Sequence, residues 1–347
     1  MSEIKINNIT NSSGDGGPVI AGVSTVSTSA FMVMPSGDTA IRGAGSGRGL
    51  FAMGLRHPSS VVDTTDLIQI SSTGNGTSFG QLTEGRMQTQ GGGNSIRGVF
   101  GGGLVPPNNT STIDYVEMSS SGGGYDFGEL SFSRRTFING ASSNSTIAIF
   151  GSGYITTNQN AMDFVNIMTV GNANDFGDLV NPKQRDQGAC ASPTRAIFAG
   201  GIGDDPAGIA AREIHFVNFA SRGNSEIFAA LTTRKFGIGA ASNTTRAVFS
   251  GGGGPAPSYT NTNTIDFITM ATGGEATDFG DMSQTRRDVY VASSATRGVF
   301  GGGYTPTIVN TIDYITIATT GNAVDFGDMQ ETKRTGASTS DSHGGVG

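Results

Sequence analysis

Hydrophobic and polar residues alternate along this chain in short runs, and clusters of Gly and Asn separate the runs. In the run 309–317, Ile312 and Tyr314 fall on one face of the expected strand, and Ile315 and Ile317 fall on the other. A strand that is apolar on both faces suits a sheet covered on both sides. No long segment has a 3.6-residue period, so the pattern predicts an all-β protein without substantial helix.

Three sequence markers recur at a period of about 50 residues. Asp-Phe-Gly occurs at 126–128, 175–177, 278–280 and 325–327, with weaker copies at 78–80 and 227–229. A Phe in front of small residues recurs every 48–51 residues, at Phe51, Phe100, Phe150, Phe198, Phe249 and Phe300. Between these two markers lies a third, as in "TIDYVEM" at 112–118. A protein kinase has one Asp-Phe-Gly together with a His-Arg-Asp loop, so a repeat explains the motif better.

Each unit provides four predicted strands, which we call a to d in chain order. Strand a begins at an Arg in five units: Arg86, Arg135, Arg185, Arg234 and Arg287. In the first unit Arg42 lies only 9 residues before Phe51, which is short for a strand and a turn. A spare segment of the same type begins at Arg334. We expect it to supply the inner strand of the first unit and to close a ring.

The order "VFGGG", "TIDYITI", "DFGDM" resembles the kelch repeat, although Phe stands in the place of the kelch Trp. The resemblance covers residues 41 to about 343. It implies a six-bladed, kelch-like β-propeller with four-stranded blades, closed by the C-terminal strand and preceded by a short N-terminal extension. The expected blades are 41–83 with 334–343, 84–131, 132–181, 182–232, 233–283 and 284–330, within a propeller domain at 41–347. Residues 1–40 are expected to serve attachment or oligomerisation, for example as a trimer.

Composition argues against several classes of function. The net charge is −7 and only 14% of residues are charged, which argues against a nucleic-acid binder held by phosphate contacts. No apolar run approaches the ~20 residues of a membrane-spanning helix, so no membrane insertion is expected. The single cysteine, Cys190, cannot form an internal disulfide.

Carboxylates recur in the middle of strand c, where burial would require a partner. They are Asp66, Asp114, Asp163, Asp266 and Asp313, and His215 takes this place in the fourth unit. Arginines recur on the neighbouring strand b, three residues before the Phe: Arg48, Arg97, Arg195, Arg246 and Arg297, with Ile147 in the third unit. We interpret these residues as structural Arg–Asp pairs, because catalysis does not need one site per blade.

No metal or cofactor is predicted. The three histidines are far apart in sequence and lack zinc-site spacing. The Asp residues beside each Phe-Gly are expected to cap turns of strand d. Calcium binding by these turns is an alternative, although neither EF-hand nor RTX spacing is present. The Gly runs precede no helix and lack the Lys-Ser/Thr of a phosphate loop.

The b–c loops vary most between units, which is typical of a binding surface on a rigid scaffold. Candidate binding residues on this face are Tyr154, Tyr259, Tyr304, His57, Asn108, Asp204 and Asp205. Exposed tyrosines among Asn, Thr and Pro suit sugar or protein contacts, but they could equally pack the loops together. The arginines that begin strand a lie on the same face, so an acidic glycan is one candidate ligand.

The repeat "TRGVFGGG…NTIDYITIATTGNAVDFGDM" and its flanks "AGVSTVSTSAFMVMPSGDT" and "SDSHGGVG" resemble virion proteins of marine tailed bacteriophages such as cyanophages. The resemblance implies a non-enzymatic tail-fibre, appendage or decoration protein, made in the host cytoplasm and located on the virion. Other virion proteins would bind residues 1–40, and a host-surface glycan or protein would bind the propeller. The alternatives are an intracellular kelch-type interaction scaffold and a glycan-active propeller enzyme.

Overall fold

The computed structural model describes residues 26–28, 31–33, 47–136, 138–180, 184–204 and 207–346. The chain divides into two units, residues 1–42 and 43–347. In the first unit, β1 (Val26–Thr28) pairs with β2 (Phe31–Val33) in antiparallel fashion. The remainder of the expected attachment segment 1–40 lies outside the described residues. The described part of the second unit is all-β, and nowhere in the described chain is there a helix that could cross a membrane.

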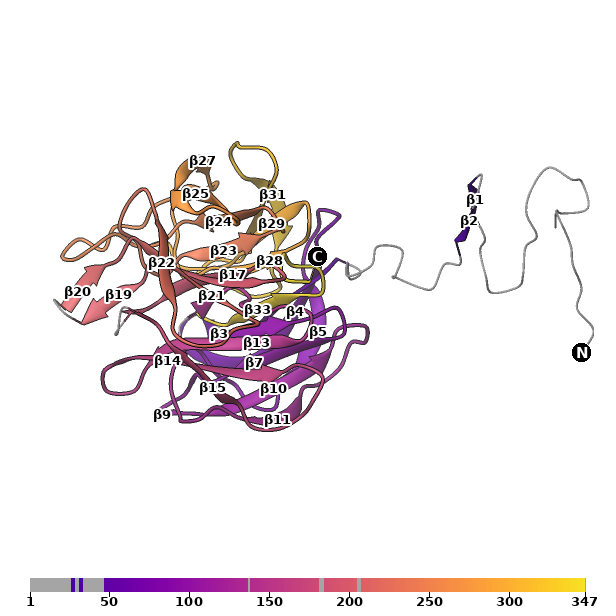
Figure 1. Ribbon diagram of the computed structural model, residues 1–347, viewed down its shortest axis with the longest axis horizontal. Coiled ribbons are helices and arrows are strands. Elements are labelled where there is room, and N and C mark those ends of the chain that lie inside the picture. The colour runs from indigo at the N-terminus through magenta and orange to yellow at the C-terminus, as the bar shows by residue number, and fades with distance from the viewer. Residues whose placement is uncertain are drawn as a thin grey trace, which may run out of the picture. The chain divides into compact units, whose positions relative to one another are not determined.

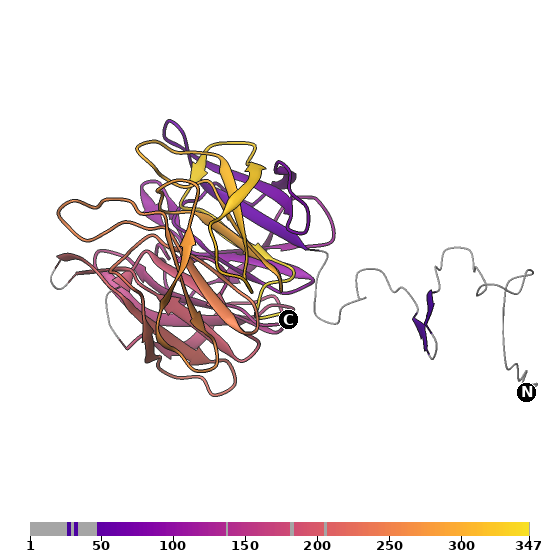
Figure 2. The same ribbon diagram turned by 90° about the horizontal axis from the view of Figure 1, so that it is seen from above.

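The second unit is a six-bladed β-propeller (Figures 1 and 2). Blade 1 contains β3 (Arg48–Arg56), β4 (Ser60–Gln69) and β5 (Thr77–Gln81); blade 2 contains β6 (Gln90–Gly93), β7 (Arg97–Gly101), β10 (Thr112–Glu117) and β11 (Tyr125–Glu129); blade 3 contains β13 (Ile147–Tyr154), β14 (Asn158–Asn166) and β15 (Asn174–Asp178). Blade 4 contains β17 (Gln187–Ala191), β18 (Arg195–Ala199), β21 (Glu213–Asn218) and β22 (Glu226–Ala230); blade 5 contains β23 (Gly239–Ser242), β24 (Arg246–Ser250), β25 (Thr264–Thr269) and β27 (Thr277–Asp281); blade 6 contains β28 (Tyr290–Ser293), β29 (Arg297–Gly301), β30 (Thr311–Thr316) and β31 (Val324–Asp328).

Short strands complete the blades and their loops. In blade 3 the segment 141–143 takes the inner position, where Ser143 pairs with Ala148. The accessory strands are β8 (Leu104–Val105), β9 (Asn108–Asn109), β12 (Ile138–Asn139), β16 (Gln184–Arg185), β19 (Ile202–Asp204), β20 (Ala207–Ala210), β26 (Gly274–Glu275) and β32 (Lys333–Arg334).

The C-terminal segment closes the ring, as the sequence predicts. Strand β33 (Ala337–Ser340) pairs with β3 and becomes the inner strand of blade 1, with Gly49 opposite Ser340. The next residue, Asp341, accepts hydrogen bonds from the backbone N–H groups of Gly47 and Arg48 at 3.1 and 2.9 Å. Asn94 caps the a–b turn of blade 2 in the same way, through Ile96 and Arg97. The closure therefore rebuilds an ordinary a–b turn from two distant parts of the chain.

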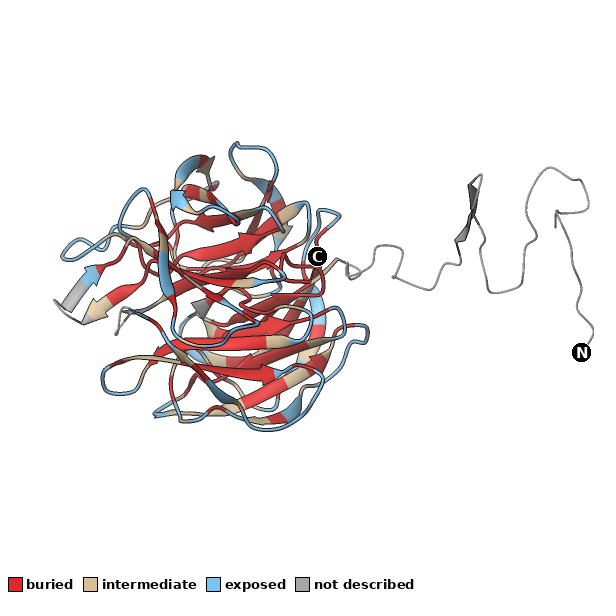
Figure 3. Cartoon of the chain, in the orientation of Figure 1, coloured by how far each residue is buried: buried red, intermediate tan, exposed pale blue. Residues whose placement is uncertain are grey.

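The core consists of apolar layers between adjacent blades, and the exposed residues lie mainly in the loops and outer strands (Figure 3). Between blades 6 and 1, for example, Phe51 and Ile68 of blade 1 pack with Val299 and Phe326 of blade 6. Phe326 of Asp-Phe-Gly is thus an inter-blade core residue, and it is only 3% exposed.

In every blade except blade 4, the Gly of the same motif allows the outer strand to be covered by the following blade. The N–H groups of Gly74 and Gly76 donate to the carbonyls of Phe326 and Asp328, both at 2.8 Å. Gly327 has φ +144°, and a Cβ there would lie 2.6 Å from the carbonyl oxygen of Gly74. Only glycine tolerates both conditions. The contact protects an outer edge that could otherwise pair with another chain.

Candidate functional site

The strand-c carboxylates are buried, but their predicted partners are wrong. The strand-b arginines do not bind them. The cation comes instead from the segment before strand a, in the pairs Asp114–Arg86, Asp163–Arg134 (2.8 Å), Asp266–Lys235 (2.9 Å), Asp313–Arg286 (2.6 Å) and Asp66–Lys333 (3.3 Å). A register shift in each c–d pairing, as between Met162 and Asp163, lets two consecutive residues face the interior and turns the carboxylate toward this cation.

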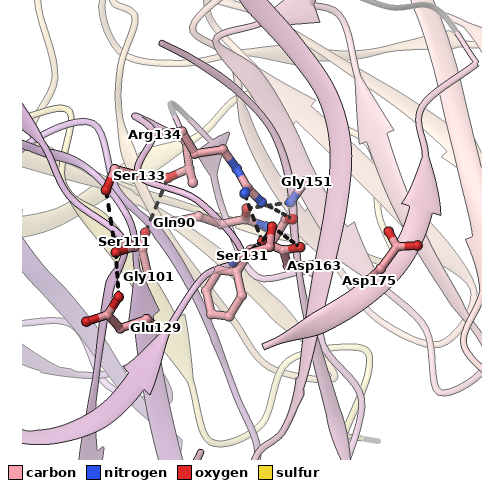
Figure 4. Close-up of polar contacts among 12 residues, drawn as sticks. Gln90, Gly101, Ser111, Glu129, Ser131, Ser133, Arg134, Gly151, Asp163 and Asp175 are labelled. Atoms are coloured by element: carbon pink, nitrogen blue, oxygen red, sulfur yellow. Dashed lines mark hydrogen bonds and ion pairs between the residues drawn. The ribbon is translucent and has the colours of Figure 1, made fainter. Parts of the chain in front are cut away.

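Blade 3 shows how completely such a pair is enclosed (Figure 4). Arg134 donates to Asp163 at 2.8 Å and to the carbonyl of Phe150 at 3.0 Å. The backbone N–H and the hydroxyl of Ser131 also bind the Asp163 carboxylate, at 3.0 and 2.8 Å. Asp175, on outer strand β15, stands apart from this network. No side of the ion pair is open to a ligand, because both side chains are almost fully buried.

Burial has the largest effect on the pKa of Arg134 and of Asp66. It lowers the pKa of the Arg134 guanidinium, and the attraction of Asp163 counteracts this effect. It likewise raises the pKa of Asp66, whereas Lys333 acts in the opposite direction. Each buried charge would be strongly destabilising without its partner. The ion pair therefore holds strand c against the inner part of the blade.

The strand-b arginines join one blade to the next. Arg97 lies over the ring of Tyr115 at 4.5 Å and donates to the carbonyl of Met168 in blade 3 at 3.2 Å. Equivalent bonds run from Arg48 to Met118, from Arg195 to Met270 and Ala271, from Arg246 to Ile317 and Ala318, and from Arg297 to Ile70. These arginines therefore reach forward along the ring, away from the strand-c carboxylates.

On the loop face, the structure brings Tyr259 and Tyr304 into one cluster, which we call the blade 5/6 cluster: Phe236, Tyr259, Asn261, Arg287, Asp288, Tyr304 and Arg334. The guanidinium groups of Arg287 and Arg334 lie 4.9 and 4.7 Å from the ring of Tyr304. Asn261 accepts from Arg287 at 3.2 Å and donates to the carbonyl of Tyr304 at 2.9 Å. Tyr259 packs edge-on against Phe236 and is 40% exposed.

Asp288 is the acidic member of this cluster and balances part of its positive charge. Its carboxylate is 3.2 Å from Arg334 and 3.7 Å from Arg287. Burial raises the pKa of Asp288, and the two arginines oppose that shift. The cluster carries two guanidinium groups against one carboxylate, so its exposed rim favours an anionic or π-rich ligand.

Tyr154 lies elsewhere on the ring but repeats the arrangement between blades 2 and 3. Arg135 lies over its ring at 5.6 Å and donates to Asn109 at 2.8 Å. Asn109 in turn donates to the carbonyl of Tyr154 at 3.3 Å. Both sets of contacts favour loop packing as one role of these tyrosines, and of the three only Tyr259 is exposed, at 40%.

The remaining predicted loop residues do not join either cluster. His57 and Asn108 are exposed, in blades 1 and 2. Asp204 belongs to β19 and its side chain is not described, and Asp205 lies outside the described residues. The asparagines that do organise the loops, Asn109 and Asn261, went unpredicted. A signal for them exists, because each begins an Asn-Thr-x-Thr stretch in front of strand c.

Metal-binding residues do not gather anywhere in the described ranges, where no group of three or more His, Cys, Asp or Glu could hold an ion. The Asp residues of the outer strands cap turns, as predicted: Asp126, Asp175 and Asp278 accept from the glycine N–H two residues later, at 3.2 Å. Comparison of the chain with models of protein families and with curated proteins gives no match.

Proposed function

We propose that this chain is a non-enzymatic, kelch-like structural protein of a bacteriophage virion, whose propeller is displayed for attachment to a host-surface glycan or protein. Residues 1–40 would join it to other virion proteins. The proposal rests on the sequence resemblance together with one structural observation. The scaffold repeats around the ring, whereas the loop face does not: of the two junctions that share the Arg–Tyr–Asn contacts, only that of blades 5 and 6 adds the exposed Tyr259 and a second arginine, Arg334.

The distribution of buried charge supports a binding role over catalysis. In the described residues, each strand-c carboxylate lies beside a cation of its own blade and is closed to substrate. An enzyme acting on glycans would need an asymmetric set of carboxylates beside a cavity. The large groove on the ring is lined entirely by uncharged residues.

The blade 5/6 cluster is the best candidate for the attachment surface. Tyr259 offers an exposed aromatic ring, and the guanidinium groups of Arg287 and Arg334 both pack against the ring of Tyr304. Rigid aromatic side chains lose little entropy on binding, and guanidinium groups recognise carboxylate or sulfate oxygens. An acidic glycan therefore fits this surface better than a neutral one.

A glycan array containing sialylated, sulfated and neutral glycans tests the ligand class. We expect the purified chain to bind acidic glycans and Tyr259→Ser to weaken that binding about tenfold, the loss of one stacking contact. Tyr125→Ser is the matched control, because Tyr125 is 58% exposed but lies on outer strand β11. Equal binding by both variants would exclude the blade 5/6 cluster as the glycan site.

Mass spectrometry of purified virions tests the location. The chain should be present in particles in a fixed ratio to the other structural proteins. Its absence from virions, combined with recovery from infected-cell lysate in complex with a cellular protein, would favour an intracellular interaction scaffold instead.

A further inference from the structure

Five of the six blade junctions contain the same arginine contact, and the sixth does not. At the five junctions, a strand-b arginine donates hydrogen bonds to backbone carbonyls of the next blade. These carbonyls lie four and five residues after the strand-c Asp or His of that blade, and each arginine binds one or both of them. Arg195 donates to Met270 and Ala271, both at 3.1 Å, and Arg246 to Ile317 and Ala318 at 3.1 and 2.8 Å. The planar guanidinium matches this pair of acceptors.

At the junction of blades 3 and 4, the arginine position is occupied by Ile147. Its side chain is shorter than that of Arg and carries no donor. The equivalent acceptors are the carbonyls of Phe219 and Ala220, and no described side chain donates to them. The aromatic ring of this junction, Phe164, is covered from the opposite direction by Arg222 of blade 4, at 4.3 Å. Arg222 therefore replaces the stacking of an arginine on the strand-c aromatic ring, whereas no side chain replaces the hydrogen bonds of an arginine to the carbonyls.

The missing arginine leaves a groove of about 520 Å³. Ile147, Phe219 and Ala220 provide its apolar surface, and its polar edge is formed by Asn144, Thr146, Thr194, Asn218 and Ser221, with Pro193 beside them. This volume is within the range of small-molecule sites. None of the lining residues is charged, and no described group donates a hydrogen bond to the carbonyls of Phe219 and Ala220.

We propose that this groove binds the guanidinium group of an arginine side chain from a protein partner. The apolar walls would cover the methylene stem, and the carbonyls of Phe219 and Ala220 would accept from the planar head. A lysine fits less well, because its ammonium group is compact and strongly hydrated. The net charge of −7 also attracts a cationic partner.

The surroundings of the groove suit a protein partner. The groove opens between the a–b turns of blades 3 and 4, on the face opposite the b–c loops. Exposed apolar side chains lie in turns of this same face: Ile96 (48%), Met168 (46%) and Val170 (53%). A peptide that places its arginine in the groove could cover these residues too. The inference does not depend on the proposed virion function.

Methyl-detected NMR of the full chain tests the proposal with N-acetyl-arginine amide as the probe. The Ile147 methyl signal should shift saturably with a Kd of about 1–10 mM, as expected for one side chain in a shallow groove. N-acetyl-citrulline amide, which has the same shape without the charge, should bind at least tenfold more weakly. The Ile96 methyl is the internal control and should not move. No shift of Ile147 by ~50 mM probe, or equal shifts with citrulline, would overturn the proposal.

Two variants give independent evidence. Ile147→Arg restores the residue found at the other five junctions, so it should raise the melting temperature and abolish the probe shift at the Ala220 methyl. Arg222→Gln removes a like charge and uncovers Phe164, so it should tighten binding of the probe severalfold. A lower melting temperature for Ile147→Arg would show that this junction lacks the geometry of the others, and the proposal would fall. Unchanged or weaker probe binding by Arg222→Gln would likewise count against it.

Discussion

Blades 6 and 4 have the same four strands but different interiors. In blade 6, Asp313 of strand c binds Arg286 at 2.6 Å. In blade 4, His215 takes the position of the Asp, and Gln184 takes the backbone position of the cation. Anion and cation are both absent in blade 4, and the blade still forms. The ion pair is therefore not required at these positions in every blade.

The outer strands of these two blades differ as well. Phe326 of blade 6 is 3% exposed, whereas its counterpart in blade 4, Phe228, is only half-buried. Ala229 stands in blade 4 where blade 6 has Gly327. At this junction the glycine of the close backbone contact belongs to blade 5 instead of blade 4. A Cβ on Gly273 of blade 5 would lie 2.6 Å from the carbonyl oxygen of Phe228. One close backbone approach per junction is kept, and either blade can supply the glycine.

The largest effect is expected from removing one charge of the blade 6 pair. Arg286→Met should lower the free energy of unfolding by ~3–5 kcal/mol, because Asp313 would remain buried without its cation. Adding Asp313→Leu should recover most of the loss. In blade 4, His215→Leu should change stability by less than ~1 kcal/mol, since no charge is left unpaired. Urea unfolding measures all three. A mild Arg286→Met phenotype would mean that the ion pair is not what stabilises blade 6.

The aromatic residues of the outer strands provide a second contrast. Phe326→Ala should cost ~3 kcal/mol or more, because it opens a cavity between blades 6 and 1. Phe228→Ala should cost roughly half as much, because its ring is already partly in water. Thermal unfolding of the two variants beside the wild type measures the difference. Equal losses would show that blade 4 depends on its outer strand as strongly as blade 6 does.

The smallest effect is the dependence of stability on pH that His215 gives to blade 4. Burial lowers the pKa of His215 below its ordinary value of 6.5. Above pH 6.5 the folded and unfolded states are both neutral at this residue. Below it, the unfolded chain binds a proton that the folded blade excludes, so stability falls as pH decreases toward the folded pKa. The slope can reach ~1.4 kcal/mol per pH unit for each such histidine.

His343 behaves in the same direction, because burial lowers its pKa to about 4. Denaturant unfolding of wild type and His215→Leu between pH 7 and pH 5 separates the two residues. The variant should lose the His215 part of the slope and keep the part from His343. Identical slopes for the two proteins would mean that His215 does not titrate differently on unfolding.

The repeat made most of the fold predictable. Phe spacing, the Asp-Phe-Gly copies and the surplus segment after Arg334 were enough to anticipate six blades and closure by the C-terminal strand. The partners of the strand-c carboxylates were not predicted correctly, although the repeats that depart from the common pattern indicate them. The strand-b arginine is missing in blade 3, where Ile147 stands, but the carboxylate is missing in blade 4. Residues that pair with each other should be lost together, as Gln184 and His215 show.

The loop contacts were less predictable for a physical reason. Strand pairing follows from the periodicity of a single segment, whereas Arg287, Tyr304 and Asn261 meet only because two blades and three loops converge. The identity of each residue was visible in the sequence, but the direction of each side chain depends on the twist of the neighbouring blade. The groove beside Ile147 was likewise hidden, because it arises from a missing side chain.

The pairing of β33 with β3 also sets the order of events during translation. Strand β3 leaves the ribosome about 290 residues before its inner partner, as the separation between Arg48 and Asp341 shows. At 5–20 residues per second, the inner edge of blade 1 stays unpaired for roughly 15–60 seconds. Single strands pair far faster than that. The rate of protein synthesis, and not the intrinsic speed of folding, therefore determines how long the nascent propeller presents an open edge to the cell.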